Sequence, residues 1–129
     1  MSHRICIVLV SGSHERLQMA AMVAAVGAVS GNDVRVLVSM NALPLFRKGV
    51  PSVAAAEGEA GLLLAGRNVP GFKQLMENAV ELGAAQLLPC SMAMDLLGYE
   101  AQDLEPYMGA ATGLTKFLGD AADGQLLSF

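Results

Sequence analysis

Residues 4–10 (Arg-Ile-Cys-Ile-Val-Leu-Val) form an apolar, mostly β-branched run with no polar residue after Arg4. A strand with one face in solvent alternates polar and apolar residues, whereas a strand covered on both faces is apolar throughout. The run therefore predicts a central strand of a parallel sheet. Ser11-Gly12-Ser13 then predicts a tight turn in which Ser13 caps a helix that reaches about Ser30.

The rest of the chain alternates between strand and helix patterns, as parallel βαβ units require. We expect strands at 34–40, 85–89 and 125–129, a weak strand near 105–108, and helices at 72–83 and about 110–122. Residues 46–49 are typical of the end of a short helix, and 52–66 fit a helix, a mobile loop or both. The predicted fold class is α/β: one domain over residues 1–129, a three-layer α/β/α sandwich with a mostly parallel, flavodoxin-like sheet of about five strands.

Composition indicates buried surface between subunits. Hydrophobic residues make up 53% of the chain and charged residues 16%, against roughly 25% charged residues in a typical protein. Between Leu17 and Val29 the only polar side chain is Gln18, so this helix has no polar face. The run is shorter than the roughly 20 apolar residues of a membrane span. We therefore expect a homo-oligomer without a membrane span.

Charge and cysteine usage exclude other classes of protein. A net charge of −4 gives no support for nucleic-acid binding, which normally shows as a basic patch. Two cysteines do not make a disulfide scaffold, and they fit a reducing, cytoplasmic setting. The turn at residues 11–13 lacks the Gly-Lys-Ser/Thr ending of a phosphate loop. No cluster has the spacing of metal ligands, so we expect neither a metal nor another cofactor.

Cys90 is the leading candidate for catalysis. It follows the predicted strand at 85–89 and precedes a short helical segment that Gly98 ends. Ligands and catalytic groups collect at the carboxyl ends of parallel strands. A cysteine at a helix N-terminus also faces unpaired N–H groups that favour its thiolate, the reactive form. The alternative is a small buried apolar residue, since free cysteine is often buried.

The segment around this cysteine resembles a known family. Cys90-x-Met92-x-Met94-Asp95-x-x-Gly98 is similar to the persulfide-loop motif of the DsrE/DsrF-like sulfurtransferases, in particular the DsrE-like branch that is sometimes called peroxiredoxin-like. Residues 8–12, 17–29, 41–48 and 109–118 resemble other parts of the family, although Ala93 stands where serine is common. The resemblance implies a flavodoxin-like fold, an oligomer and a cysteine that carries sulfane sulfur as a persulfide.

The persulfide loop supplies further candidates. We expect the backbone N–H groups of Ser91 and Met92 to stabilise an anion on Cys90. Met92 and Met94 fit either a polarizable wall for sulfur or ordinary core packing. Asp95 is expected to accept hydrogen bonds from neighbouring backbone N–H groups, because a carboxylate beside the thiol would oppose thiolate formation.

The first strand-to-helix turn is a candidate neighbouring site. In a flavodoxin-like strand order, Gly12, Ser13 and His14 would adjoin the Cys90 turn. His14 would then stabilise a thiolate or move a proton, and the alternative is a solvated histidine in the first helical turn. Cys6 lies early in the first strand, about 17 Å from the active end by the rise per residue. It therefore cannot bridge to Cys90 without a large movement.

These patterns predict a subunit that relays sulfur, a sulfurtransferase-type persulfide carrier whose Cys90 holds sulfane sulfur between partner proteins. TusA-like and rhodanese-like carriers are candidate donors and acceptors. Two alternatives remain open. The first is a non-catalytic oligomeric module that binds a ligand or regulates a partner, and the second is a thiol peroxidase.

Overall fold

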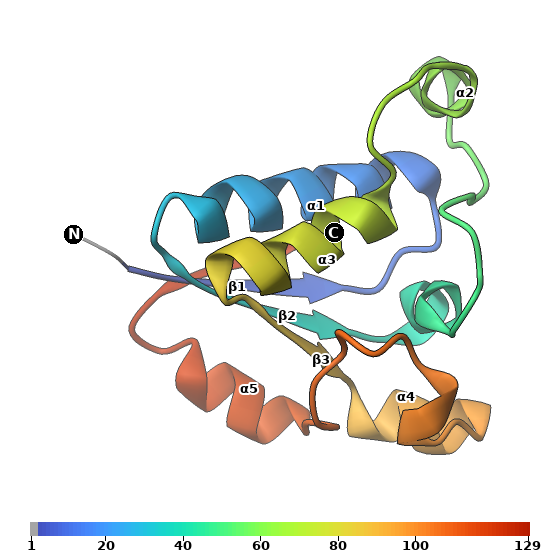
Figure 1. Cartoon of the computed structure of the whole chain (residues 1–129). Helices are drawn as coiled ribbons and strands as arrows, with labels where there is room; N and C mark the ends of the chain where they lie inside the picture. Colours follow the sequence, from blue (N-terminus) through green and yellow to red (C-terminus); the bar gives the residue numbers. More distant parts are fainter. Residues whose placement is uncertain (1–2) are drawn as a thin grey trace.

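A computed structural model describes residues 3–129. Its elements in chain order are β1 (Arg4–Leu9), α1 (His14–Val29), β2 (Asp33–Val38), the 3-10 helix η1 (Met40–Phe46), α2 (Glu59–Gly66), α3 (Phe72–Gly83), β3 (Gln86–Pro89), α4 (Ser91–Leu97), the 3-10 helix η2 (Ala101–Asp103), α5 (Leu114–Asp120) and β4 (Gln125–Ser128). The strands are parallel and lie in the order β3-β2-β1-β4. Helices α1 and α3 cover one face of the sheet, and α4 and α5 lie on the other (Figure 1). The predicted three-layer α/β/α sandwich is confirmed.

The central position of β1 is also confirmed, because β2 and β4 flank it. Ser13 caps α1 as predicted, and its hydroxyl accepts the N–H of Arg16 at 3.4 Å. Helix α1 packs closely on α3: a Cβ placed on Gly83 would lie 2.5 Å from the Cβ of Ala28. Glycine at this position thus lets the two helix backbones approach each other.

The sheet has four strands rather than the predicted five or so. The expected strand near 105–108 is absent from the described residues. Instead, isolated parallel bridges join Met108 to Leu87 and Thr112 to Cys90. The chain advances by four residues between Met108 and Thr112 and by three between Leu87 and Cys90, so the extra residue interrupts the ladder in the manner of a bulge. Helix α5 consequently begins at Leu114 rather than near residue 110.

The strand order corrects a second expectation. Because β2 lies between β1 and β3, the first strand-to-helix turn does not adjoin the turn that holds Cys90. The expected adjacency would require β1 and β3 to be paired, as in the flavodoxin order. Side-chain pattern alone does not distinguish these two orders, since β1 and β2 are both largely buried.

Residues 47–58 form an extended strap along the carboxyl edge of the sheet, and α2 follows it. The Nζ of Lys73 donates to the carbonyl oxygens of Arg47 and Val50. The carboxylate of Glu15 accepts the N–H groups of Glu57, at 2.8 Å, and Gly58, at 2.7 Å. Residues 47–66, which show no clear sequence pattern, therefore form a strap that hydrogen bonds hold in place, followed by a short helix. No helix among residues 3–129 is long and apolar enough to cross a membrane.

Candidate functional site

Cys90 occupies the first position after β3, at the carboxyl edge of the sheet, and caps α4. Its N–H donates to the carbonyl oxygen of Val38 at 2.9 Å, and its own carbonyl accepts the N–H of Met94 at 2.9 Å. These bonds hold the residue between β2 and α4. Cys90 is 7% exposed, so the thiol lies below the surface rather than on an open loop.

A cavity of about 220 Å³ lies beside Cys90. Its lining comes from the ends of β1 and β2 and from the starts of α4 and α5: Val8, Val10, Leu37, Ser39, Met40, Cys90, Ser91, Met92 and Leu114. None of these side chains is charged. An anion formed in this cavity therefore depends on hydrogen-bond donors for stabilisation, since no cation lines it.

The backbone donors near the thiol differ from the expected pair. The N–H of Ser91 donates to the carbonyl oxygen of Thr112 at 3.0 Å, so it is not free to bind an anion on Cys90. This correction follows from the 108–112 segment, which runs beside β3 and takes up the donor. The N–H groups of Met92 and Ala93 have no acceptor within α4, because they lie in its first turn.

The other persulfide-loop residues separate into two groups. Ser91 and Met92 line the cavity. Met94 is buried in the core and Asp95 is exposed, and neither lines it. Asp95 was expected to accept backbone hydrogen bonds with its side chain, whereas the N–H of Gly98 donates to the backbone carbonyl of Asp95, at 3.3 Å.

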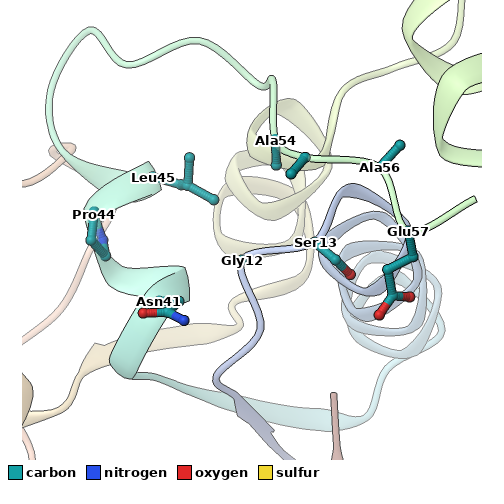
Figure 2. Close-up of a pocket in the computed structure, with 9 residues that line it drawn as sticks. Gly12, Ser13, Asn41, Pro44, Leu45, Ala54, Ala56 and Glu57 are labelled. Atoms are coloured by element: carbon teal, nitrogen blue, oxygen red, sulfur yellow. The ribbon is translucent and has the colours of Figure 1, made fainter.

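The first turn belongs to a different cavity. Gly12 and Ser13 line a hollow of about 550 Å³ together with parts of η1 and the strap: Asn41, Pro44, Leu45, Ala54, Ala55, Ala56 and Glu57 (Figure 2). Cys90 does not line this hollow. The ring of His14 is buried and packs edge-on against Phe72, with ring centroids 5.6 Å apart. His14 is thus a core residue and not the solvated histidine of the alternative interpretation.

The strap does not cover Cys90 either. No residue from 52–66 lines the cavity beside Cys90, whereas residues 54–57 line the larger hollow. Although the strap follows η1 at the carboxyl end of β2, it does not run toward the cysteine. It turns toward α1 instead, because Glu15 and the N–H of His14 bind its backbone.

Cys6 is fully buried within β1, and burial is the main cause that raises the pKa of its thiol. It pairs in register with Arg35, which pairs with Gln86. Cys90 lies four residues beyond Gln86 and two strands from Cys6, which separates the two cysteines by roughly 16 Å. An internal disulfide is excluded at this separation.

Sequence reasoning missed the contribution of β2 to the site. Ser39 and Met40 directly follow this strand and line the Cys90 cavity. Met40 has a φ of 46°, a left-handed conformation that is costly for a residue with a side chain. The available signal was their position at the carboxyl end of a predicted strand, where catalytic groups collect in parallel sheets.

Comparison with known proteins identifies the family. The sequence profile of the DsrE/DsrF/DrsH-like family matches residues 61–129, more than half of the chain, so the chain belongs to this family. The ychN protein from E. coli has a similar structure, with 15% identity, a TM-score of 0.65 and coverage of 100% of both chains. A protein of unknown function from Methanobacterium thermoautotrophicum, MTH1491, is similar at 7% identity, with a TM-score of 0.58 and coverage of 100% of both chains. These structures establish a common fold alone. No curated protein sequence gives a significant match.

Proposed function

We propose that the protein is a sulfur carrier in which Cys90 holds sulfane sulfur as a persulfide. The observation that carries this proposal is the cavity beside Cys90 at the carboxyl edge of a parallel sheet, where catalytic groups collect. Membership of the DsrE/DsrF/DrsH-like family supports it. The 220 Å³ volume leaves room for an additional sulfur atom and for the end of a partner's cysteine.

In the proposed reaction the Cys90 thiolate attacks the outer sulfur of a donor persulfide. A bond forms between Sγ of Cys90 and that sulfur while the donor's S–S bond breaks. Its electron pair leaves with the donor sulfur as a thiolate, which takes up any proton from the original persulfide. A second transfer of the same kind, in which an acceptor thiolate attacks the outer sulfur, restores Cys90. Each step exchanges one sulfur–sulfur bond for another, so neither step needs an oxidant or a reductant. One cysteine therefore suffices without a resolving thiol.

The surroundings of the cavity favour delivery by a protein. Four apolar residues that line it are also well exposed: Val10, Met40, Met92 and Leu114, at 39 to 62%. They form an apolar rim that a partner would cover on docking. Small anionic donors would gain no charged contact from this lining. Cysteines of TusA-like or rhodanese-like carriers are therefore the proposed donors and acceptors.

We also propose that the carrier is a homo-oligomer. Helix α1 buries its alanine-rich side under α3 and on the sheet, but Met19, Met22, Val26 and Val29 remain 43 to 69% exposed. Apolar side chains gathered on one exposed helix face mark a surface for association. The cavity at Cys90 opens on another part of the molecule, so association through α1 would leave it accessible to partners.

Intact-protein mass spectrometry after incubation with polysulfide tests the carrier function. We expect gains of roughly 32 Da per sulfur atom, by atomic mass, on wild type and on Cys6→Ser but not on Cys90→Ser, because the thiolate must be reachable to take up sulfur. Retention of the added mass by Cys90→Ser would refute the assignment. Cys6→Ser is the matched control because Cys6 is fully buried.

The low exposure of Cys90, 7%, favours one other candidate, a non-catalytic module of the same fold in which this cysteine is only packed. Alkylation at neutral pH separates the two functions. Iodoacetamide should modify Cys90 in the folded carrier within minutes, whereas a packed thiol would react only at the rate of unfolding. Peroxide consumption with a thiol reductant would instead indicate a peroxidase.

A further inference from the structure

Ser39 is held rigidly beside the cysteine by its backbone. It directly follows β2 and is 5% exposed. Its N–H donates to the carbonyl oxygen of Leu9 at 2.9 Å, and its carbonyl accepts the N–H of Ala42 at 3.1 Å. The preceding carbonyl, that of Val38, accepts the N–H of Cys90. Ser39 and Cys90 are therefore fixed to the same hydrogen-bonded junction between β2 and β3.

The hydroxyl of Ser39 has no partner in this position. Serine at the start of a helix usually caps it, yet the Ser39 side chain makes no capping bond to η1. No other hydrogen bond of this hydroxyl is formed within residues 3–129. Among residues 3–129, the fully shielded side-chain atoms without a partner are Oε1 of Gln18 and the hydroxyl of Tyr107, so the Ser39 hydroxyl keeps contact with the open space beside it. Its position on the lining of the Cys90 cavity gives it one place to find a partner, which is the cavity itself.

The Ser39 hydroxyl and the outer sulfur of a Cys90 persulfide would share the same cavity. The sulfur of the resting thiol is a weak hydrogen-bond acceptor, whereas an anionic sulfur accepts a stronger, charge-assisted bond. A persulfide places a second sulfur atom about 2 Å beyond Sγ. That outer sulfur carries the negative charge, and the lining offers no cation to neutralise it. The N–H of Ser91 is already taken by Thr112. The donors left near the outer sulfur are the Ser39 hydroxyl on the cavity lining and the remaining N–H groups in the first turn of α4.

We propose that the Ser39 hydroxyl donates a hydrogen bond to the outer sulfur of the Cys90 persulfide and so binds the loaded state in preference to the free thiol. This inference rests on the proposed carrier function. The bond is charge-assisted, since the acceptor is an anion. No covalent bond changes, and the hydroxyl keeps its proton. Ser39 then holds the transferred sulfur in place until an acceptor thiolate reaches it.

The test compares variants that differ in one hydroxyl, all in the Cys6→Ser background. Ser39→Ala removes the hydroxyl, and Ser39→Thr and Ser39→Val form a pair of the same shape with and without it. Ser30→Ala removes the hydroxyl of an exposed serine at the end of α1, outside the cavity lining, and serves as the control. Each protein is loaded with polysulfide and desalted, and loss of the added sulfur is followed by intact mass. The rate of iodoacetamide alkylation of the unloaded thiol is measured in parallel.

We expect Ser39→Ala to lose its persulfide about tenfold faster than wild type, as the removal of one charge-assisted bond predicts. Ser39→Val should lose it faster than Ser39→Thr, and Ser30→Ala should resemble wild type. Alkylation of the unloaded thiol should change by less than about twofold in all of them. If Ser39→Ala does not fold, the comparison of Ser39→Thr with Ser39→Val tests the inference in its place.

Two outcomes would overturn the inference and leave the carrier function intact. Wild type that loads with sulfur and loses it at the same rate as Ser39→Ala refutes the role of Ser39 alone. A tenfold change in alkylation of the unloaded thiol would show that Ser39 acts on the thiol instead of the persulfide, which also refutes it. Wild type that takes up no sulfur on Cys90 refutes the carrier function, and the Ser39 assignment with it.

Discussion

The N–H of Cys90 donates to the carbonyl oxygen of Val38 across 2.9 Å, and this bond joins the ends of two neighbouring strands. It continues the pairing of β2 with β3 by one residue beyond Pro89. Ser39 and Met40 consequently lie beside the cysteine. The environment of Cys90 is thus set by a strand pairing between segments that are about fifty residues apart in sequence.

Two positions with a left-handed backbone predict opposite effects on stability. Ala84 ends α3 with a φ of 58°, and Gly98 ends α4 with a φ of 72°. Ala84→Gly should raise the free energy of unfolding by about 0.5 to 1 kcal/mol, because glycine adopts this conformation without a steric cost. Gly98→Ala should lower it by about 1 kcal/mol. Urea denaturation measures both, and a destabilised Ala84→Gly would contradict the argument.

Gly98→Ala is informative because a Cβ on Gly98 would meet no other atom within 4 Å. Any loss of stability in that variant therefore reports backbone conformation and not a clash. An unchanged midpoint for Gly98→Ala would indicate that the left-handed conformation relaxes without cost.

Acid should weaken the amino end of the sheet. Hydrogen bonds from Arg35, and then from Arg4, hold the pKa of Asp33 below its ordinary value of 3.8. A carboxyl with a lowered folded-state pKa stabilises the fold above its ordinary pKa, and that contribution disappears as pH falls through the folded-state pKa. Asp33→Asn should therefore destabilise the protein at pH 7 and cost progressively less below about pH 4.

The size of this effect is limited by solvent. The Asp33 side chain is 38% exposed, so we expect a loss below about 1 kcal/mol at pH 7. Thermal unfolding at pH 7 and pH 3 compares the variant with wild type. Asp123→Asn is the control because Asp123 forms no ion pair within the described part of the chain. An equal loss at both pH values would mean that Asp33 acts by packing rather than by charge.

Charge on the exposed face of α1 should dissociate the proposed oligomer. Val26 is 69% exposed on that helix, and Val26→Glu would place a carboxylate inside an apolar contact. We expect light scattering at micromolar concentration to give the mass of a monomer for this variant and a multiple of 13.4 kDa for wild type. Leu96→Glu, on α4 at the opposite layer (Figure 1), should keep the wild-type mass. Monomeric wild type would contradict the prediction.

Amide hydrogen exchange should be faster in the strap and in α2 than in the core. Residues 52–66 are almost all partly or fully exposed, with Gly61 as the buried exception, so their amides should exchange faster than those of residues 5–10. Equal protection of the two segments would place the strap in the core. Glu15→Ala should speed exchange further at Glu57 and Gly58, whose N–H groups its carboxylate accepts. Glu59→Ala is a control, since no hydrogen bond of its side chain is formed within residues 3–129.

The elements with strong local signals were predictable. The helix after Ser13 was placed by its N-cap, and the helix at 72–83 by apolar residues at helical spacing, of which Phe72, Met76 and Ala79 are buried. The strand before Cys90 was also placed, because it is a short apolar run that a proline ends. The predicted boundaries were wrong where the N–H groups of Gly109 and Thr112 donate to the carbonyl oxygens of Leu87 and Pro89 in β3, since a bridge between distant residues leaves no periodic pattern.

The sequence by itself determined the fold class, the family resemblance and the placement of Cys90 between a strand and a helix, because these depend on side-chain patterns within about ten residues. Only the tertiary structure decided which strand ends meet. It separated Gly12 and Ser13 from Cys90, buried His14 against Phe72 and brought Ser39 to the cysteine. Strand order follows from how whole faces pack and how backbone groups pair over long separations, and such pairings are not encoded in local periodicity.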